Sequence, residues 1–439
     1  MLIITNHSKT NKMKKSVITF AILVFTISVS AQKLIDIYKS GTVKLVADNE
    51  YAQGNNWDKV FETYYDTIYG EPMGERKSLI IMPDGSVTVN NRYRNYYTKF
   101  SPEGVFENEF GITNKEGKKY KKTNAISGII NDNTFFTELD NMGNMICFNF
   151  DGNYVKTLKL DYMTRQMIPL SSNKIAVVGW VLWKTKIREF VAIVDYETNK
   201  QNIIWDHFTD RCEDFDHCKL FNYAYKFEKG GAFSFTTMPF SKITGMSSPP
   251  KIACIGEKLV LGIPATGEIL VYNLTGNLKS KKVIDWAANY ISVDEQIEIQ
   301  QKAIDQYENK DIPVFASQRV TPTEIKIAQE TILKQMKEDL GKISEPISLP
   351  TFSTLIKDSD GNILFFEFPE ENDANKFNVW VYKNGGSFVC QSSFICDEFE
   401  LQINPNKMVF HNGYIYGLQH KKNVKGVPLR LVRFKLTMN

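Results

Sequence analysis

The chain has 439 residues, 43% of them apolar and 13% aromatic, which is enough to bury a large core. Of its 53 basic residues, four (Lys9, Lys12, Lys14 and Lys15) precede position 31, and the other 49 nearly balance the 50 acidic residues. This balance argues against a nucleic-acid-binding protein, which needs a concentrated basic face.

Residues 1–31 have the pattern of a secretory signal peptide. In "KKSVITFAILVFTISVSAQ", two lysines precede an apolar run over residues 17–29, and small residues precede Gln32, which predicts cleavage after Ala31. Translation could begin at Met1 or at Met13. No later apolar run is long enough to cross a membrane, so we expect an exported protein, periplasmic or extracellular, with no membrane span after cleavage.

A turn followed by a short strand recurs along the remaining chain. The copies read "SPEGVF", "FDGNYVKTL", "YETNKQ", "LTGNLK" and "KNGGSF", with turn residues at Pro102, Asp151, Thr198, Thr275 and Asn384. The first two intervals, 102 to 151 and 151 to 198, have the length of a propeller blade, and the later intervals are lengthened by insertions. Gly and Asn in these turns supply the positive φ angles that tight hairpins need.

Each period contains four strand-like segments, such as "AISGII", "TFFTEL", "NMICFNF" and "YVKTLKL". Four-stranded antiparallel units at this period predict an all-β fold, a six-bladed β-propeller over residues 32–439. The sixth unit has only three strands before the chain ends, and an open sheet edge favours aggregation. We therefore expect residues 41–48, "GTVKLVAD", to supply its outer strand and close the ring.

The stretch "SLIIMPDGSVTVNNRYRNYYTKFSPEGVF" resembles the repeats of NHL-type six-bladed propellers, which combine a D-G turn, a short strand, a polar stretch and a v-F-d-x-x-G ending. The first, second and fifth units match this pattern best. With the signal peptide, the resemblance implies an exported bacterial six-bladed propeller. It implies a fold and no particular activity, because propellers host binding modules, scaffolds and enzymes.

The insertions fall on one face of the predicted disc. When the strands of a blade are labelled a to d from the channel outward, the a–b and c–d turns are all short. The long connections join b to c, or join d to the next a. Long loops carry function more often than tight turns do. The face with the b–c and d–a connections, called here the elaborated face, is therefore the predicted binding surface.

The largest insertion, residues 286–342 between the fourth and fifth blades, is expected to be a helical hairpin. "SVDE" (292–295) and "TPTE" (321–324) are capping boxes, and Gly341 follows the second helix. Apolar residues recur every 3.6 positions at Ile325, Ala328, Ile332, Met336 and Leu340. The hairpin could pack on the rim or face of the disc, cover the channel mouth, or bind a partner.

Candidate ligand-binding residues are Arg92, Tyr93, Arg94 and Tyr96 in "NNRYRNYYTKF", and Trp183 in "GWVLWK". Guanidinium groups beside aromatic rings can stack on sugars or hold acidic groups. The alternative is that the tyrosines pack within the sheet and the arginines are solvated. Trp180 is assigned to the core.

Six cysteines in an exported chain suggest disulfides, and the short spacings favour bridges Cys212–Cys218 and Cys390–Cys396. The second bridge requires a turn, because six residues of straight strand span roughly 20 Å. The segment "DHFTDRCEDFDHC" is rich in carboxylates and could hold calcium or zinc, but its spacing matches neither an EF-hand nor a paired zinc motif. A solvated acidic loop is favoured, with no cofactor expected and calcium as the one possibility.

No nucleophile elbow, zincin motif, P-loop or Rossmann glycine motif is present. We therefore predict an exported binding module that recognises a glycan, a peptide or a protein on its elaborated face, without chemistry. The alternatives are a calcium-dependent propeller enzyme of the lactonase or lyase type, and a structural or assembly protein.

Overall fold

The structure, a computed structural model, describes residues 34–61, 77–91, 96–111, 113, 116, 127–131, 134–139, 144–170, 173–183, 186–210, 222–228, 232–237, 249–284, 290–309, 320–348, 350–367, 376–383 and 386–438. The predicted signal peptide lies outside these residues. Among the described helices, none is both long and apolar enough to span a membrane.

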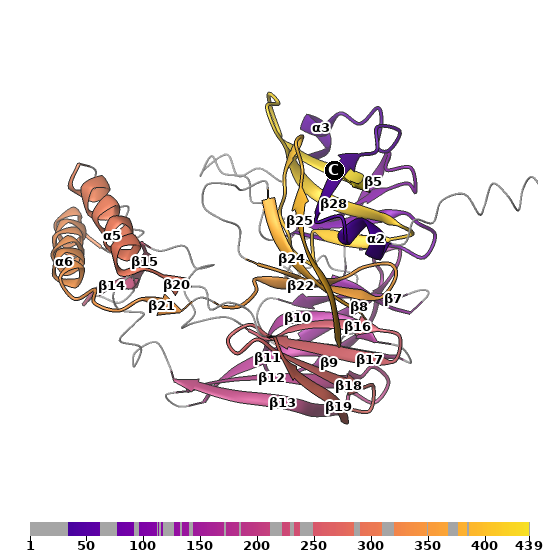
Figure 1. Ribbon diagram of the computed structural model, residues 1–439, viewed down its shortest axis with the longest axis horizontal. Helices are drawn as coiled ribbons and strands as arrows, with labels where there is room; N and C mark the ends of the chain where they lie inside the picture. Colours follow the sequence, from indigo (N-terminus) through magenta and orange to yellow (C-terminus); the bar gives the residue numbers. More distant parts are fainter. Residues whose placement is uncertain are drawn as a thin grey trace, which may run out of the picture.

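Most of the described chain forms antiparallel sheets whose strands pair in chain order (Figure 1). Short turns join most neighbouring strands, as the recurring turn pattern predicts. Four sheets are separate and have four strands each: β2 (Lys77–Ile81), β3 (Val87–Asn91), β4 (Tyr96–Phe100) and β5 (Phe106–Gly111); β6 (Ser127–Asn131), β7 (Thr134–Leu139), β8 (Asn144–Asn149) and β9 (Tyr154–Lys159); β10 (Met163–Leu170), β11 (Lys174–Trp183), β12 (Lys186–Asp195) and β13 (Gln201–Asp210); and β16 (Lys251–Ile255), β17 (Lys258–Ile263), β18 (Glu268–Asn273) and β19 (Leu278–Val283).

A larger sheet of nine strands joins the two ends of the chain. β1 pairs antiparallel with β29, with Val43 opposite Met438, which is the partner expected for residues 41–48. β1 also pairs in parallel with β25, with Thr42 opposite Ser393, a contact that the repeat pattern does not predict. The strands of this sheet are β22 (Thr354–Lys357), β23 (Asn362–Phe366), β24 (Lys376–Lys383), β25 (Ser387–Ile395), β1 (Thr42–Ala47), β29 (Leu429–Met438), β28 (Tyr414–Lys421), β26 (Phe399–Glu400) and β27 (Met408–His411).

The sheets are arranged as in a β-propeller, because the first strand of each sheet contacts the first strand of the next, from β2 through β6, β10 and β16 to β22. The core lies in layers between successive sheets. For example, Val178 and Val191 of one sheet pack against Leu259 and Leu261 of the next. The last sheet packs against the first in the same way, with Leu418 of β28 in one cluster with the first sheet's apolar side chains.

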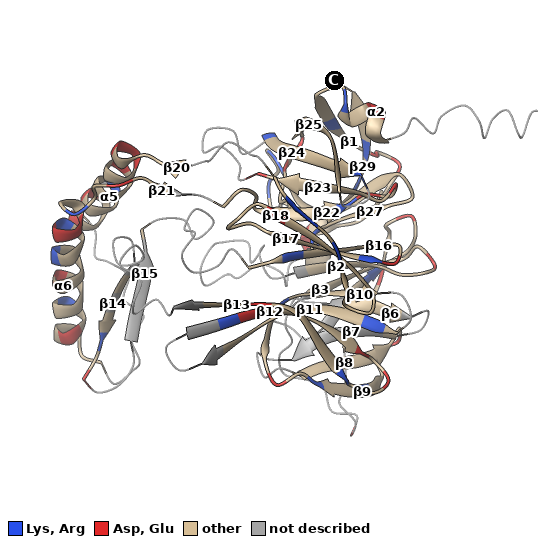
Figure 2. Ribbon diagram, turned by 60° about the horizontal axis from the view of Figure 1, so that its bottom comes forward, with Lys and Arg blue, Asp and Glu red and all other residues tan. Residues whose placement is uncertain are grey.

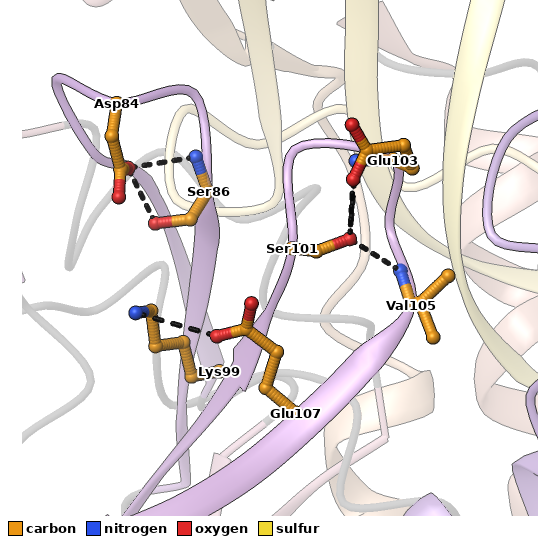
Figure 3. Close-up of polar contacts among 7 residues, drawn as sticks. All are labelled: Asp84, Ser86, Lys99, Ser101, Glu103, Val105 and Glu107. Atoms are coloured by element: carbon orange, nitrogen blue, oxygen red, sulfur yellow. Dashed lines mark hydrogen bonds and ion pairs between the residues drawn. The ribbon is translucent and has the colours of Figure 1, made fainter.

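The recurring turns are held by side chains that accept hydrogen bonds from the turn backbone. In the first sheet, Asp84 Oδ1 accepts from the backbone N–H of Ser86 at 2.9 Å, and Ser101 Oγ accepts from the N–H of Val105 at 3.3 Å (Figure 3). A Lys99–Glu107 ion pair at 3.3 Å links the two strands that leave the second turn. Local polar side chains therefore determine where these turns form.

The "FDGN" turn follows the same rule. Asn149, the residue before this stretch, accepts from the N–H groups of Asp151 at 3.1 Å and Asn153 at 2.8 Å. Gly152 adopts a φ of +82°, which a residue with a side chain seldom adopts. The recurrence of this motif is thus explained by turn geometry.

Two short helices lie near the N-terminal strand: α2 (Leu34–Tyr38) and α3 (Trp57–Phe61). The hydroxyl of Tyr38 donates to Asp358 Oδ2 at 3.0 Å, and this carboxylate also accepts from the amide of Asn362 at 2.7 Å. Because Asp358 is 1% exposed, these hydrogen bonds satisfy a buried polar group and join the N-terminal helix to a turn of the β22–β23 hairpin.

The predicted helical hairpin is present as α5 (Val293–Glu308) and α6 (Pro322–Leu340). Ser292 caps α5 by accepting from the N–H of Glu295, and Thr321 and Glu324 form a complete capping box at α6. A two-residue pairing of β20 (Tyr290–Ile291) with β21 (Ile347–Ser348) closes the base of this insertion. Both helices carry charged residues: α5 has five acidic residues and one lysine, and in α6 acidic residues and lysines are interspersed (Figure 2).

The helices pack on a second insertion. The hairpin of β14 (Asn222–Lys226) and β15 (Ala232–Thr236) comes from the connection between β13 and β16, and its Tyr223 shares an apolar cluster with Ile332 and Met336 of α6. The amide of the buried Gln300 donates to the Tyr223 hydroxyl at 2.5 Å. Two insertions far apart in sequence therefore form one unit beside the sheets, the helical subdomain, made of β14, β15, β20, α5, α6 and β21 (Figure 1).

Candidate functional site

The five predicted ligand-binding residues are only partly covered by the structure. Arg92, Tyr93 and Arg94 lie outside the described residues. Tyr96 begins β4 and Trp183 ends β11, where it pairs with Lys186 across the b–c connection, but the structure describes only their backbone. Their role in binding stays a prediction.

A different set of side chains meets on the third sheet, beginning with a β-bulge in β10. Thr164 pairs with Gly179 and Gln166 pairs with Val178, so Arg165 has no partner residue on β11. Bulges redirect a side chain and are frequent beside active sites. The Arg165 guanidinium lies 5.0 Å from the centre of the Trp180 ring, a cation–π contact.

The residue after the bulge joins β10 to the neighbouring sheet. Gln166 Nε2 donates to the carbonyl of Ile252 at 3.0 Å, and the N–H of Ile252 donates to Gln166 Oε1 at 3.0 Å. The side-chain amide thus pairs with the backbone of β16 as a strand would. Because Arg165 precedes Gln166 and Lys251 precedes Ile252, this pairing brings the two cations into electrostatic contact.

A carboxylate completes the group. Glu189 on β12 stands opposite Trp180 on β11 and opposite His207 on β13, so the three side chains form one row across the same face of the sheet. Burial raises the pKa of Glu189, while the charges of Arg165, His207 and Lys251 act in the opposite direction. We call Arg165, Glu189 and Lys251 the charged cluster, with Trp180 and His207 beside it.

The pKa values of the two cations of the charged cluster are both lowered. Burial, with the positive charge of Arg165, lowers the pKa of the half-buried Lys251 to about 8. Solvent reaches Arg165, yet the surrounding protein removes part of its hydration and lowers its pKa below the ordinary value. Among the described residues, Glu189 is the carboxylate that acts on both cations. Such perturbed groups gathered from separate strands are typical of functional sites.

The charged cluster lies toward the elaborated face. Arg165, Glu189 and Lys251 are near the starts of their strands, and Trp180 and His207 are near the ends of theirs, which are the ends that meet the b–c and d–a connections. The sheet that carries most of the cluster is also the one whose outer strands extend on the side of the helical subdomain (Figure 1, Figure 2).

Sequence reasoning missed this cluster. Trp180 was expected in the core but is half-buried against Arg165. Its partners are scattered from position 165 to position 251, so no motif marks them. The one local signal is a charged residue, Glu189, at the start of the apolar run "EFVAIV". An isolated acid of this kind needs a partner from another strand.

The predicted bridge between Cys390 and Cys396 is absent, because both residues are free thiols. The chain stays in β25 through Ile395, so no turn brings the two sulfur atoms together, and this prediction is wrong. Cys147 is a buried free thiol, and burial raises its pKa to about 12. Cys212 and Cys218 lie outside the described residues.

The acidic segment near those cysteines is described only as far as Asp210. Asp206 and His207 lie within β13, where Asp206 Oδ2 pairs with Arg188 at 2.7 Å. Within the described ranges, no three His, Cys, Asp or Glu side chains are placed to hold a metal ion together. Calcium binding by the rest of this segment stays a prediction.

No family model and no curated protein matches the chain. Its backbone is similar to solved structures at low identity. A DUF4221 family member from Bacteroides vulgatus is 10% identical, with a TM-score of 0.42 over 91% of this chain and 100% of that chain. Virginiamycin B lyase from Staphylococcus aureus is 12% identical, with a TM-score of 0.35 over 83% of this chain and 95% of that chain. A gluconolactonase from Xanthomonas campestris is 8% identical, with a TM-score of 0.38 over 82% of this chain and 86% of that chain. At these identities and TM-scores, the likeness implies no shared ligand or activity.

Proposed function

We propose that this chain is an exported six-bladed propeller of the NHL type that binds a ligand on its elaborated face, at the charged cluster. The ligand is a glycan, a peptide or a protein. The observation that carries the proposal is the cluster itself. Arg165, Glu189 and Lys251 come from three strands in two sheets. They are brought together by the bulge in β10 and by the pair of hydrogen bonds between Gln166 and Ile252, called here the clasp.

A purely structural role explains this arrangement less well. Placing Lys251 beside Arg165 disfavours the charged form of Lys251, so the contact costs folding free energy. Proteins tolerate such arrangements chiefly at binding and catalytic sites. Trp180 adds a flat apolar surface next to the charges, a combination that suits sugar rings and aromatic or aliphatic side chains.

The architecture supports the proposed ring. The pairing of β1 with β29 supplies a fourth strand to the last unit, and the packing of Leu418 against the first sheet gives that unit a neighbour on its far side. Export is proposed from the signal-like pattern of residues 1–31.

Binding is tested by screening the mature chain, residues 32–439, on arrays of glycans and peptides. Each hit is remeasured with Arg165→Gln, Glu189→Gln and Lys251→Met. Arg188→Gln is the matched control, because Arg188 lies on the same strand as Glu189 but points to the other face and pairs with Asp206. We expect the three cluster variants, and not the control, to lose binding. Hits that tolerate all three changes would place the site elsewhere.

A further inference from the structure

The chemistry of the charged cluster identifies a ligand group. Its three charges are two cations and one carboxylate; burial disfavours the charged form of both cations, and the charge of Arg165 further disfavours that of Lys251. Within the described part of the chain, no second carboxylate acts on either cation. With both cations protonated, the cluster therefore has one positive charge more than it can neutralise.

We propose that the ligand carries a carboxylate group, which is held between the Arg165 guanidinium and the Lys251 ammonium. This inference rests on the proposed binding function and adds the chemical class of the group recognised. A single carboxylate brings the charge of the site to zero, whereas a phosphate dianion would leave it negative.

The geometry suits this group. A guanidinium binds carboxylates through paired N–H donors in its plane, and these donors stay free for an anion when the guanidinium lies over an aromatic ring, as Arg165 does over Trp180. Lys251 contributes a point charge from the neighbouring sheet. The clasp between Gln166 and Ile252 sets the spacing of the two cations before any ligand arrives, so little ordering is needed on binding.

Glu189 has a definite place in this scheme. It stands between Trp180 and His207 on the sheet face and interacts with both cations. Its negative charge offsets one of the two positive charges, which reduces the repulsion between the cations when no ligand is bound. The same charge repels ligands that carry two negative charges. Replacing Glu189 with Gln should therefore shift the preference from monoanions toward dianions.

The test uses the smallest matched probes, acetate and acetamide, which have the same shape and differ in charge. The lysines of the mature chain are dimethylated with ¹³C, which keeps their charge, and the Lys251 signal is identified by its loss in Lys251→Arg. Acetate should shift this signal saturably and raise the pKa of Lys251, because an anion favours the charged ammonium. Acetamide should do neither.

Variants separate the site from general charge effects. Arg165→Gln should weaken acetate binding about tenfold or more, since a charge-assisted hydrogen bond is lost. Arg188→Gln should leave it unchanged. Circular dichroism and thermal melts confirm that each variant is folded.

The inference is overturned by any of three results: acetate leaves the Lys251 signal unmoved, Arg165→Gln binds acetate as tightly as the chain without this substitution, or inorganic phosphate binds more tightly than acetate. Its failure is distinct from failure of the proposed function. If neutral ligands bind and the cluster variants abolish their binding, only the proposal of a carboxylate ligand fails. If every array hit binds the cluster variants as well as the natural sequence, both proposals fail.

Discussion

Gln166 and Ile252 connect two neighbouring sheets through two hydrogen bonds of 3.0 Å each, between the side-chain amide of Gln166 and the backbone N–H and carbonyl of Ile252. The residues are 86 positions apart. Ile252 is 1% exposed, so its N–H and carbonyl have little access to water and depend on this side chain. The same contact positions Arg165 beside Lys251.

Replacing Gln166 with Leu should therefore destabilise the protein. Two buried backbone groups would lose their partner, which costs about 2 kcal/mol or more of the free energy of unfolding. Gln201→Leu is the control, because the exposed Gln201 makes only a 3.4 Å hydrogen bond to the carbonyl of Lys159. Urea denaturation measures both, and equal losses would show that the clasp contributes nothing of its own.

Lys251 should make stability depend on pH. Its pKa falls from 10.5 to about 8 on folding, so between these values the unfolded chain binds more protons than the folded one. Stability should rise with pH across this window, because the penalty for burying the charged ammonium, about 3 kcal/mol, is relieved as Lys251 deprotonates.

Comparing Lys251→Met with the chain of natural sequence isolates the contribution of Lys251 to this pH dependence, because the other titrating groups, including Arg165, Glu189 and the tyrosines, remain in both. The stability advantage of the variant should shrink as the pH rises from 7 to 10.5 in urea denaturation. A constant difference across this range would mean that Lys251 titrates normally.

Asp48 and Arg433 should be a main link between the two ends of the chain. Arg433 Nη2 lies 2.8 Å from Asp48 Oδ2, and the Asp48 side chain is 4% exposed. Arg433→Met would leave this carboxylate buried without its main partner, at a cost of about 3 kcal/mol. Lys435→Met should cost less than about 1 kcal/mol, since Lys435 is exposed and 3.6 Å from Asp48.

Removing the N-terminal strand is the stronger form of this experiment. Deleting residues 32–48 should lower the melting temperature, because β29 would lose its outer partner and the proposed ring would open. Thermal melts of the mature chain and the shortened chain provide the comparison. An unchanged melting temperature would refute ring closure by β1.

Two glycines allow backbone strain to be separated from packing. Gly104 has a φ of +81°, and a Cβ atom there would lie 2.6 Å from the Tyr51 ring. Gly413 has a φ of +79°, and a Cβ atom there would have no atom within 4 Å beyond its chain neighbours. Both alanine variants should bear the strain of a left-handed backbone, about 1 to 2 kcal/mol. Gly104→Ala should cost at least about 1 kcal/mol more in thermal or urea unfolding, because Tyr51 must move. Equal costs would mean that the turn adjusts freely.

Several elements follow directly from local sequence. The turn after Asn149 forms because that residue accepts from two N–H groups of the turn and Gly152 permits the positive φ. The start of α6 follows from the Thr321–Glu324 capping box. These determinants act over two to four residues, so they can be read without knowing the rest of the fold.

The candidate site is different. Of the residues that we predicted from aromatic and basic patterning, Arg92, Tyr93 and Arg94 lie outside the described residues, and Tyr96 begins β4. The charged cluster was not predicted, because Arg165 is redirected by a bulge that no turn residue signals. The partnership of the β14–β15 hairpin with α6 was missed for the same reason, since Tyr223 and Met336 meet only in space.

The sequence by itself determined the turns, the four-strand units and the two capped helices, because hydrogen bonds and periodicity within a few residues encode them. The pairing of the N-terminal strand was expected from the missing fourth strand of the last unit. Only the tertiary structure decided which charges meet. Arg165, Glu189 and Lys251 are neighbours because strand register and the Gln166 clasp place them together. Their altered pKa values arise from burial and mutual charge, which no single segment possesses.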